Sequence, residues 1–419
     1  APELTLYTML PLPILSVTIY KLSRIINEKS TLVQEILSKM SSFAQETFSG
    51  ISVIKSYNLQ HKMNTSFSDL AYDSFEKNMS LVKVQAWFFP LMILLIGCSN
   101  LIVIYVGGNQ YINGKIEIGV LAEFIIYVNM LTWPVAVVGW ITSIVQQAEA
   151  SQKRINVFLK EKPEIDDGPG INKSINGNIK FKNVSLVYPE TNITALRNIS
   201  LEIPSGTTLG VIGNIGSGKT TFLDLISRLY DPSEGSIEID GFNIKDYRIE
   251  EIRGSLAYVP QNAFLFSESI EDNIRFGSIN ANKEEIQKAT KHAKVHDNII
   301  GFKEGYKTLL GERGVTLSGG QIQRVSIARG LIKKPNILLL DDCLSAVDID
   351  TEEEILKHLK IETKNKTTII VSHRISSVKH ADLIIVFKNG QIVQKGGHID
   401  LINIKGYYKE LSKKQHSDM

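Results

Sequence analysis

The chain has 419 residues, which exceeds one ordinary domain and predicts two or three. Its 46 lysines and arginines nearly balance 44 aspartates and glutamates, and the net charge of +2 gives no reason to expect nucleic acid as a partner. Two cysteines exclude a disulfide scaffold and a cysteine-rich zinc module.

Three apolar runs in the first part of the chain are long enough to cross a bilayer, which takes about 20 mostly apolar residues. They cover residues 4–26, 84–106 and 124–147, and the last two contain no charged residue. Uncharged runs of this length are rare in the cores of soluble proteins. A partial α-helical transmembrane domain over residues 1–150, in contact with a lipid bilayer, is therefore favoured over a soluble helical domain.

The distribution of basic residues predicts how this domain is oriented. Residues 21–83 contain eight lysines and arginines, whereas residues 107–117 contain only Lys115. The positive-inside rule places 21–83 in the cytoplasm and 107–117 outside, so everything after the third run is cytoplasmic. We expect a multi-pass protein of the cell membrane, with turns at 107–109 and 113–114. The polar stretch between the first two runs has helical spacing, with a break near Gly50.

A second domain follows a polar linker over residues 151–176, which contains Pro163 and Asp167-Gly168-Pro169-Gly170. From 177 to 419 strand and helix patterns alternate, which predicts an α/β domain with a largely parallel sheet. The strand candidates are 179–188, 208–213, 236–240, 337–341 and 368–372. The helix candidates are 220–229, 283–292, 321–331 and 352–359.

A glycine-rich motif lies between one of these strands and the helix that follows it. Residues 213–220 read Gly-Asn-Ile-Gly-Ser-Gly-Lys-Thr, which fits the phosphate-binding loop pattern. Its glycines let backbone N–H groups close around phosphate oxygens, Lys219 reaches the β and γ phosphates, and Thr220 offers a hydroxyl to Mg²⁺. The motif predicts an ATP site that uses Mg²⁺.

Two carboxylates end the apolar strand 337–341. Strand ends in α/β sheets face the ligand crevice, where Asp341 can hold Mg²⁺ and Asp342 can polarise an attacking water. His373 follows another apolar strand, where it can contact a γ-phosphate. Gln261 and Tyr188 also end apolar runs, and the Tyr188 ring can stack on a base.

A second glycine-rich segment, Leu317-Ser318-Gly319-Gly320-Gln321, precedes the helix candidate 322–331. Ser318 and the backbone N–H groups can bind an anion at the N-terminus of this helix. A simple helix cap explains Ser318 and Gly319 equally well.

Together these motifs resemble an ATP-binding cassette exporter, and the resemblance covers essentially the whole chain. The segment 317–321 matches the family's five-residue signature, which is close to diagnostic when it lies between the phosphate loop and the aspartate-ending strand, as here. The resemblance implies a transmembrane helical bundle followed by a P-loop nucleotide-binding domain with a helical subdomain. It implies nucleotide contacts from Tyr188, Gly213, Asn214, Gly216, Ser217, Gly218, Lys219, Thr220, Thr221, Ser318, Gly319, Gly320 and Gln321.

The resemblance also assigns roles beyond the phosphate loop. It implies Thr220, Gln261 and Asp341 at Mg²⁺, and Asp342, His373 and Gln261 in catalysis. Residues 345–348 resemble the family's D-loop. Residues 311–314 resemble an exporter-specific segment that touches the membrane domain.

The membrane half resembles the same family. Residues 46–55 resemble an intracellular loop with a coupling helix, and residues 119–127 resemble the entry of the sixth span. The three runs would be the fourth, fifth and sixth spans of a six-span half-transporter, and we expect that its first three spans are absent from this chain.

Asp342 is the main departure from the family pattern, because fully active members usually carry Glu there. The shorter side chain and the complete signature resemble the subunit of a heterodimeric exporter whose own site turns over poorly, while its signature completes the site of a Glu-containing partner. The alternatives are a homodimeric exporter with slow Asp-dependent hydrolysis and an ATP-binding regulatory or channel-like membrane subunit. A soluble DNA-repair ATPase is disfavoured by the apolar runs. A small molecule, a lipid or a peptide all remain possible cargoes.

Overall fold

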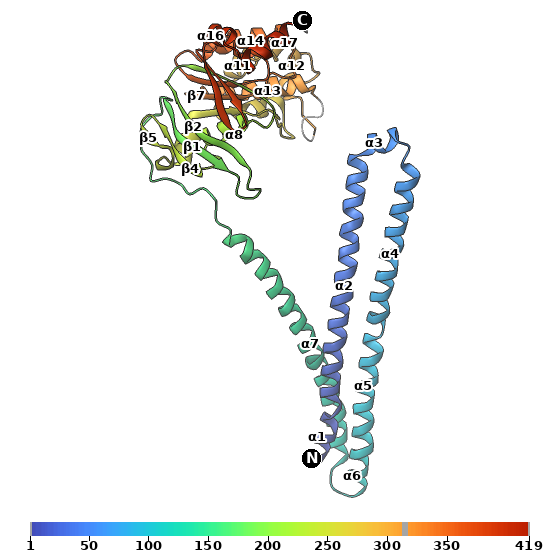
Figure 1. Cartoon of the computed structure of the whole chain (residues 1–419). Helices are drawn as coiled ribbons and strands as arrows, with labels where there is room; N and C mark the ends of the chain where they lie inside the picture. Colours follow the sequence, from blue (N-terminus) through green and yellow to red (C-terminus); the bar gives the residue numbers. More distant parts are fainter. Residues whose placement is uncertain (1, 312–316, 418–419) are drawn as a thin grey trace. The chain divides into compact units, whose positions relative to one another are not determined.

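The computed structural model describes residues 2–311 and 317–417, which form two compact units divided between Lys162 and Pro163. The first unit is entirely helical where it is described (Figure 1). Its elements are α1 (Pro2–Met9), α2 (Pro11–Ser49), α3 (Ile51–Ser56), α4 (Gln60–Ala86), α5 (Phe88–Ile102), the π-helix η1 (Val103–Gly107), α6 (Gly108–Ile112) and α7 (Ile118–Lys160).

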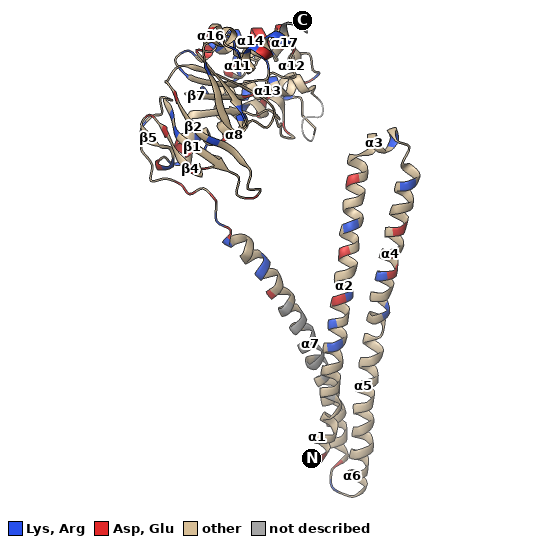
Figure 2. Ribbon diagram, in the orientation of Figure 1, with Lys and Arg blue, Asp and Glu red and all other residues tan. Residues whose placement is uncertain are grey.

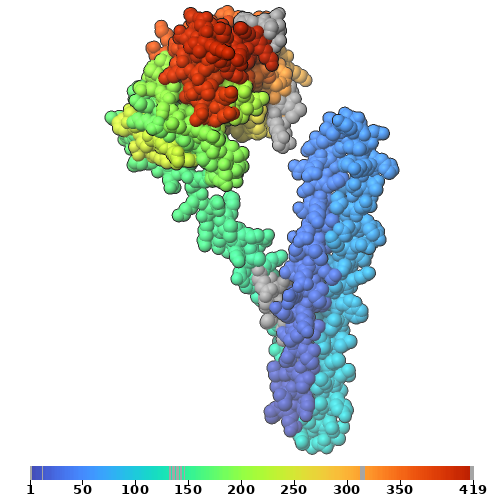
Figure 3. All heavy atoms as spheres, in the orientation of Figure 1, coloured from blue at the N-terminus to red at the C-terminus, as the bar shows by residue number. Residues whose placement is uncertain are grey.

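Helix α2 is the centre of this unit and packs against α4, α5 and α7. Figure 3 shows α2 in deeper blue and α4 in lighter blue touching along their length. The expected break at Gly50 is present, because α2 ends at Ser49 and the short α3 joins it to α4. In the α2–α5 hairpin, Figure 2 shows the charged residues on α4, on α3 and on the part of α2 beside α4, whereas α5 carries none.

Two helical stretches among the described residues are long and apolar enough to span a membrane, 2–49 and 60–112. Large apolar side chains on α5 face outward, including Ile93 at 68% and Leu101 at 67% exposed, as lipid contact requires. The run expected at 124–147 lies within α7, but several of its side chains are outside the described set.

The turn expected at 107–109 was wrong. Gly107 and Gly108 are helical, and the chain turns at Asn113-Gly114, where Gly114 has a φ of +70°. A Cβ at Gly107 would lie 2.8 Å from Leu121 Cδ1 and 3.4 Å from Leu4 Cδ2. This glycine therefore permits close packing of helices instead of a reversal of the chain.

The second unit contains two sheets. A six-stranded sheet has the order β10-β9-β3-β8-β7-β6, with β9, β3, β8, β7 and β6 parallel and β10 antiparallel at one edge. Its strands are β3 (Thr208–Gly213), β6 (Leu256–Val259), β7 (Ile337–Asp341), β8 (Thr367–Val371), β9 (Leu383–Lys388) and β10 (Gln391–Gly396).

The strands expected at 179–188 and 236–240 do not join the parallel sheet. They are β1 (Ile179–Val187) and β4 (Glu234–Ile239) of an antiparallel sheet ordered β2-β1-β4-β5, with β2 (Thr194–Ile203) and β5 (Phe242–Asn243). The reason is visible in β1, whose buried and exposed residues alternate with a shift near Asn183, whereas β7 is buried throughout. Alternation is typical of antiparallel strands with one wet face, and continuous burial of parallel ones.

Two hydrophobic cores cover the two faces of the parallel sheet, and β7 supplies both. Ile337 and Leu339 enter the core shared with the antiparallel sheet, while Leu338 and Leu340 enter the core shared with the helices. Helices α8 (Lys219–Ile226) and α9 (Ile249–Ser255) pack into the core shared with the antiparallel sheet. The helices of the other core are α10 (Ile270–Arg275), α11 (Lys283–His292), α12 (His296–Ile300), α13 (Gly319–Ile332), α14 (Ile349–Glu362), α15 (Ile375–Val378), α16 (His398–Asn403) and α17 (Tyr407–Ser417). This double burial fixes the carboxyl end of β7, where Asp341 and Asp342 lie.

Candidate functional site

The glycine-rich loop joins β3 to α8 and needs glycine at two positions. Gly216 and Gly218 have φ values of +74° and +99°, which L side chains rarely adopt. A Cβ at Gly218 would also lie 2.6 Å from the backbone oxygen of Ala195. The loop can therefore close tightly over the first turn of α8, where free backbone N–H groups favour an anion.

Lys219 begins α8 and is folded back onto this loop. Its ammonium donates to the backbone oxygens of Gly213 at 2.9 Å and Asn214 at 2.8 Å, and the residue is only 7% exposed. Burial lowers the pKa of Lys219, and the nearby charges of Asp342 and Asp341 oppose that shift. The cation is thus held at the base of the loop, with two carboxylates beside it.

Ser217 is the one residue of the loop with a buried, unsatisfied group. Its Oγ finds no hydrogen-bond partner among the described residues, although the residue is only 4% exposed. A buried hydroxyl without a partner is costly and indicates a missing ligand. A phosphate oxygen in the loop would satisfy it.

Asp341 ends β7 and is 2% exposed. Its carboxylate accepts hydrogen bonds from the Thr220 hydroxyl and from Tyr258 Oη, the latter at 3.4 Å. Burial raises the pKa of Asp341, while these two hydrogen bonds act in the opposite direction. The pairing of Thr220 with Asp341 brings together two of the three residues expected at Mg²⁺, and hard oxygen donors fit that ion.

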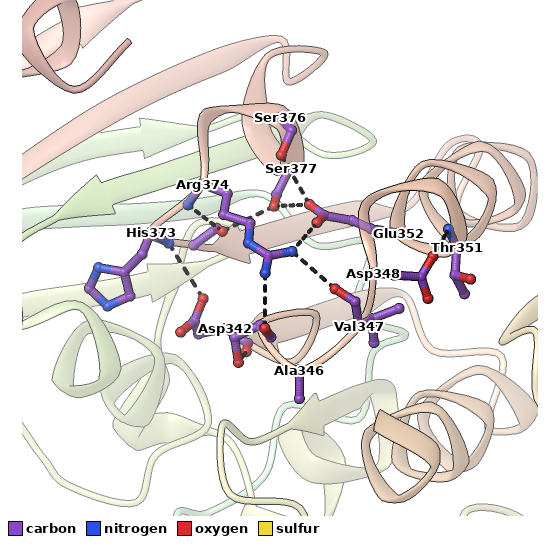
Figure 4. Close-up of polar contacts among 12 residues, drawn as sticks. Asp342, Ala346, Val347, Asp348, Thr351, Glu352, His373, Arg374, Ser376 and Ser377 are labelled. Atoms are coloured by element: carbon purple, nitrogen blue, oxygen red, sulfur yellow. Dashed lines mark hydrogen bonds and ion pairs between the residues drawn. The ribbon is translucent and has the colours of Figure 1, made fainter. Parts of the chain in front are cut away.

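Asp342 follows in the left-handed region, with a φ of +44°. Its backbone N–H donates to the Val371 oxygen at 2.9 Å, which ties the turn to β8. Its two carboxylate oxygens receive long hydrogen bonds of 3.4 Å from the His373 backbone N–H and from Gln261 Nε2. Figure 4 shows Asp342 bonded to the backbone of His373.

The charges around His373 set its protonation. Burial lowers the pKa of His373, the Lys219 cation adds to that effect, and the carboxylates of Asp342 and Asp341 oppose it. Burial raises the pKa of Asp342, against the influence of His373 and Lys219. The imidazole is therefore neutral near pH 7 and can accept or donate a hydrogen bond to a ligand.

A cleft of about 570 Å³ brings most of the predicted site residues together. Those that line it are Tyr188, Gly216, Ser217, Gly218, Lys219, Thr220, Thr221, Gln261, Asp341, Asp342 and His373. Gly213 and Asn214 do not line it and lie at the base of the loop, where Lys219 binds their carbonyls. Tyr188 donates to or accepts from the Thr221 hydroxyl at 2.9 Å, and its ring packs edge-on against Tyr230.

Sequence reasoning missed two groups at this site. Ile193, Thr194 and Ala195 line the cleft from β2 and the turn before it. Tyr258 on β6 bridges Asp341 to Asp224, at 3.4 and 3.3 Å. A tyrosine in an otherwise apolar strand indicates a hydroxyl with a polar partner at the strand's end. Which residues are the partners of Tyr258 depends on the order of the strands in the sheet.

The segment 318–321 does not line this cleft. Ser318 caps α13: its Oγ accepts from the Gln321 N–H at 3.3 Å, and Gln321 Oε1 accepts from the Ser318 N–H at 2.9 Å. Ser318 and Gly319 are exposed, so the capped N-terminus of α13 is open to another molecule. Of the segment expected at 311–314, residues 312–314 lie outside the described residues.

Comparisons with known proteins agree with this geometry. Residues 196–345 match the family described as ABC transporter, and residues 1–135 match the ABC transporter transmembrane region. The chain is 36% identical to the multidrug resistance-like ATP-binding protein MdlA of Escherichia coli (strain K12), covering 99% of this chain and 70% of that protein. It is also 36% identical to the ATP-dependent lipid A-core flippase of Desulfotalea psychrophila, covering 98% of this chain and 72% of that protein.

A solved structure has the same fold. A bacterial Atm1-family ABC exporter with ATP bound aligns with a TM-score of 0.88 and 27% identity, over 99% of this chain and 73% of that chain. The alignment includes both the helical unit and the two-sheet unit.

Proposed function

Because the chain belongs to the ABC transporter family and is an exporter of the multidrug or lipid type with an ATP-hydrolysing domain, we propose that it is the weakly hydrolysing half of a heterodimer. Asp342 carries this proposal. It occupies the position from which a carboxylate polarises the attacking water, and it is one methylene shorter than the glutamate usual in the family.

The residues of the cleft support binding of ATP with Mg²⁺. Among the described residues the Ser217 hydroxyl has no hydrogen-bond partner, and the Lys219 ammonium donates to two backbone carbonyls that phosphate oxygens can replace. Thr220, Asp341 and Gln261, which all line the cleft, would hold Mg²⁺. When bound, ATP supplies the free energy that makes switching of the transporter favourable.

The position of the signature supports a dimer. Its residues 318–321 lie at the exposed N-terminus of α13 and not in the chain's own cleft. In the proposed complex they complete the partner's ATP site, and the partner's signature completes this one. The carboxylate that limits hydrolysis and the signature that supports it would then act at different sites.

We further propose that the exporter lies in the cytoplasmic membrane with its ATP-binding unit in the cytoplasm. The eight basic residues of 21–83 against one in 107–117 support that orientation. The relatives named for multidrug resistance and for lipid A-core flipping support an amphiphilic small molecule or lipid as cargo.

Purification by a tag on this chain tests the proposal. The expected result is that a second half-transporter with Glu at the position of Asp342 co-purifies, and that ATP hydrolysis requires it. The same chain expressed alone is the control, assayed for ATP binding to confirm that it is folded. Rapid hydrolysis by the chain alone, with Asp342 unchanged, would contradict the proposal and favour a homodimer.

A further inference from the structure

Arg374 connects two segments that both border the ATP cleft. It follows His373, and its guanidinium reaches across to the D-loop, residues 345–348 (Figure 4). Nη1 donates to the Val347 backbone oxygen at 3.1 Å, and Nη2 donates to the Ser345 backbone oxygen at 3.1 Å. One side chain thus holds the backbone of the D-loop from the segment that carries His373.

A buried carboxylate fixes the guanidinium in this position. Arg374 Nη1 donates to Glu352 Oε2 at 2.7 Å, and Glu352, in the first turn of α14, is only 1% exposed. The other oxygen of Glu352 accepts from the hydroxyls of Ser376 and Ser377. A buried charge paired with a cation tolerates few other arrangements. The planar fork of arginine carries its donors on separate nitrogens in a fixed geometry, so it reaches the carboxylate and both carbonyls together.

The D-loop is attached on its other side to the signature helix α13. Gln323 is 8% exposed, and its Oε1 accepts from the Ala346 N–H at 3.0 Å. Its Nε2 donates to Ser345 Oγ at 3.3 Å, and that hydroxyl donates in turn to the Asp342 backbone oxygen at 2.8 Å. A Cβ at Gly320 would lie 2.8 Å from the Ala346 oxygen, so α13 and the D-loop are in close contact.

These contacts form one continuous path inside a single chain. It begins at Asp342 and His373 in the chain's own cleft, passes through Arg374 and the D-loop, and ends on α13 one turn from the signature. We infer that Arg374 and Gln323 are positioning residues that align the signature helix with the chain's own ATP cleft. The inference rests on the proposed function, because it gives the weakly hydrolysing cleft a regulatory role at the partner's site.

Two substitutions test the path. Arg374→Lys keeps a cation for Glu352 but cannot also reach both D-loop carbonyls, and Gln323→Met removes both amide hydrogen bonds at nearly constant volume. In the purified complex we expect each to lower the maximal rate of ATP hydrolysis by about 10- to 100-fold, since misplacement by about 1 Å has an effect of that order. The ATP concentration at half-maximal rate should change less than about twofold.

Rescue and hydrogen exchange separate positioning from general stability. Gln323→Glu keeps an acceptor for Ala346, so it should recover most of the rate lost in Gln323→Met. Amide hydrogen exchange at residues 343–348 should be faster in Gln323→Met than in the wild type. In both Gln323→Met and Arg374→Lys, ATP should no longer protect residues 317–323 from exchange. Lys334→Met, which breaks the exposed Lys334–Glu285 pair at 2.6 Å, is the matched control and should leave rate and exchange unchanged.

The inference is overturned if Arg374→Lys and Gln323→Met both keep a maximal rate within twofold of the wild-type rate. It is also overturned if Gln323→Glu is as slow as Gln323→Met and the two Gln323 variants lose the same thermal stability. If Arg374→Lys fails to fold, the two Gln323 variants decide alone. Exchange at Ala346 reports a bond within one chain, so it tests the path even where no partner co-purifies. Failure of the proposed function is seen separately, in the wild-type chain expressed alone.

Discussion

Replacement of Asp342 by Glu lengthens the carboxylate to the form that the family resemblance leads us to expect, and so tests the proposed slow hydrolysis at this cleft. Asp342 Oδ1 and Oδ2 lie 3.4 Å from the His373 N–H and from Gln261 Nε2, at the long limit of a hydrogen bond. One added methylene advances the carboxylate by about 1.5 Å, the length of a carbon–carbon bond. The Glu carboxylate then extends further into the cleft, where the attacking water would lie.

The size of the gain follows from that displacement. Misplacement of a catalytic group by about 1 Å can cost on the order of a hundredfold in rate, so we expect Asp342→Glu to raise hydrolysis at this site by about 10- to 100-fold. This corresponds to about 1.4–2.8 kcal/mol of barrier. A stability cost accompanies it, because Asp342 has a φ of +44° and glutamate tolerates that region less well than aspartate. A loss of about 1 kcal/mol lowers the Tm by about 2–4 °C in a domain of this size.

The assay compares ATP turnover by the wild-type and Asp342→Glu complexes at saturating ATP, with the partner's catalytic glutamate replaced by Gln so that only this site contributes. Asp350→Glu, the same one-methylene change at an exposed position, is the control and should leave turnover unchanged. An unchanged rate in Asp342→Glu, with ATP binding retained, would refute the claim that carboxylate length limits this site.

Three further changes test other parts of the structure. Gly218→Ala should destabilise the chain by about 1–3 kcal/mol and weaken ATP binding. Gly216→Ala, also at positive φ but in open space, should have a smaller effect on stability and on ATP affinity. Thermal unfolding and ATP titration compare the two variants. Burial raises the pKa of Asp224 from 3.8 to about 6, so the folded chain retains a proton that the unfolded chain releases, and this group's stabilisation is lost as the pH rises through about 6. Asp224→Asn should flatten the Tm profile between about pH 4 and 7, measured without nucleotide. Gln415 on α17 donates to the His373 oxygen at 2.8 Å and accepts from the Ile375 N–H at 2.9 Å. Gln415→Ala should therefore lower the rate of hydrolysis severalfold and cost about 1 kcal/mol of stability, as seen in ATP turnover and thermal unfolding.

The phosphate loop could be predicted from sequence because all its residues are adjacent in the chain. The strand before it, the glycines and the helix after it form one local unit, and the structure places them as β3, the loop and α8. Asp341 and His373 could be predicted to lie near it because the carboxyl ends of parallel strands share one edge of a sheet. Strand order alone decides which side chains meet there, and no local pattern contains that order.

The contacts of Arg374 illustrate what local patterns omit. Glu352 looks like an ordinary exposed acid in a helix of charged residues, yet it is 1% exposed. Its burial follows from the packing of α14 beside α15, which depends on where β8 lies in the sheet. The antiparallel sheet of β1 and β4 is hidden for a related reason, because a βα repeat surrounds these strands in the sequence and their pairing depends on the three-dimensional strand order.

The separation of Asp342 from the signature within one chain is consistent with the proposed division of labour between two half-transporters. If residues 318–321 served the chain's own cleft, slow hydrolysis at Asp342 would leave the complete signature without a function. Substitutions would then be expected in the signature as well as at Asp342. In the structure the signature lies outside that cleft, on a helix whose N-terminus is capped and exposed. The signature can therefore serve a partner's site whatever happens at Asp342. Asp342 and the signature are joined by the path through the D-loop. On the inference drawn above, ATP bound in this cleft would set the position of α13 even where Asp342 hydrolyses it slowly.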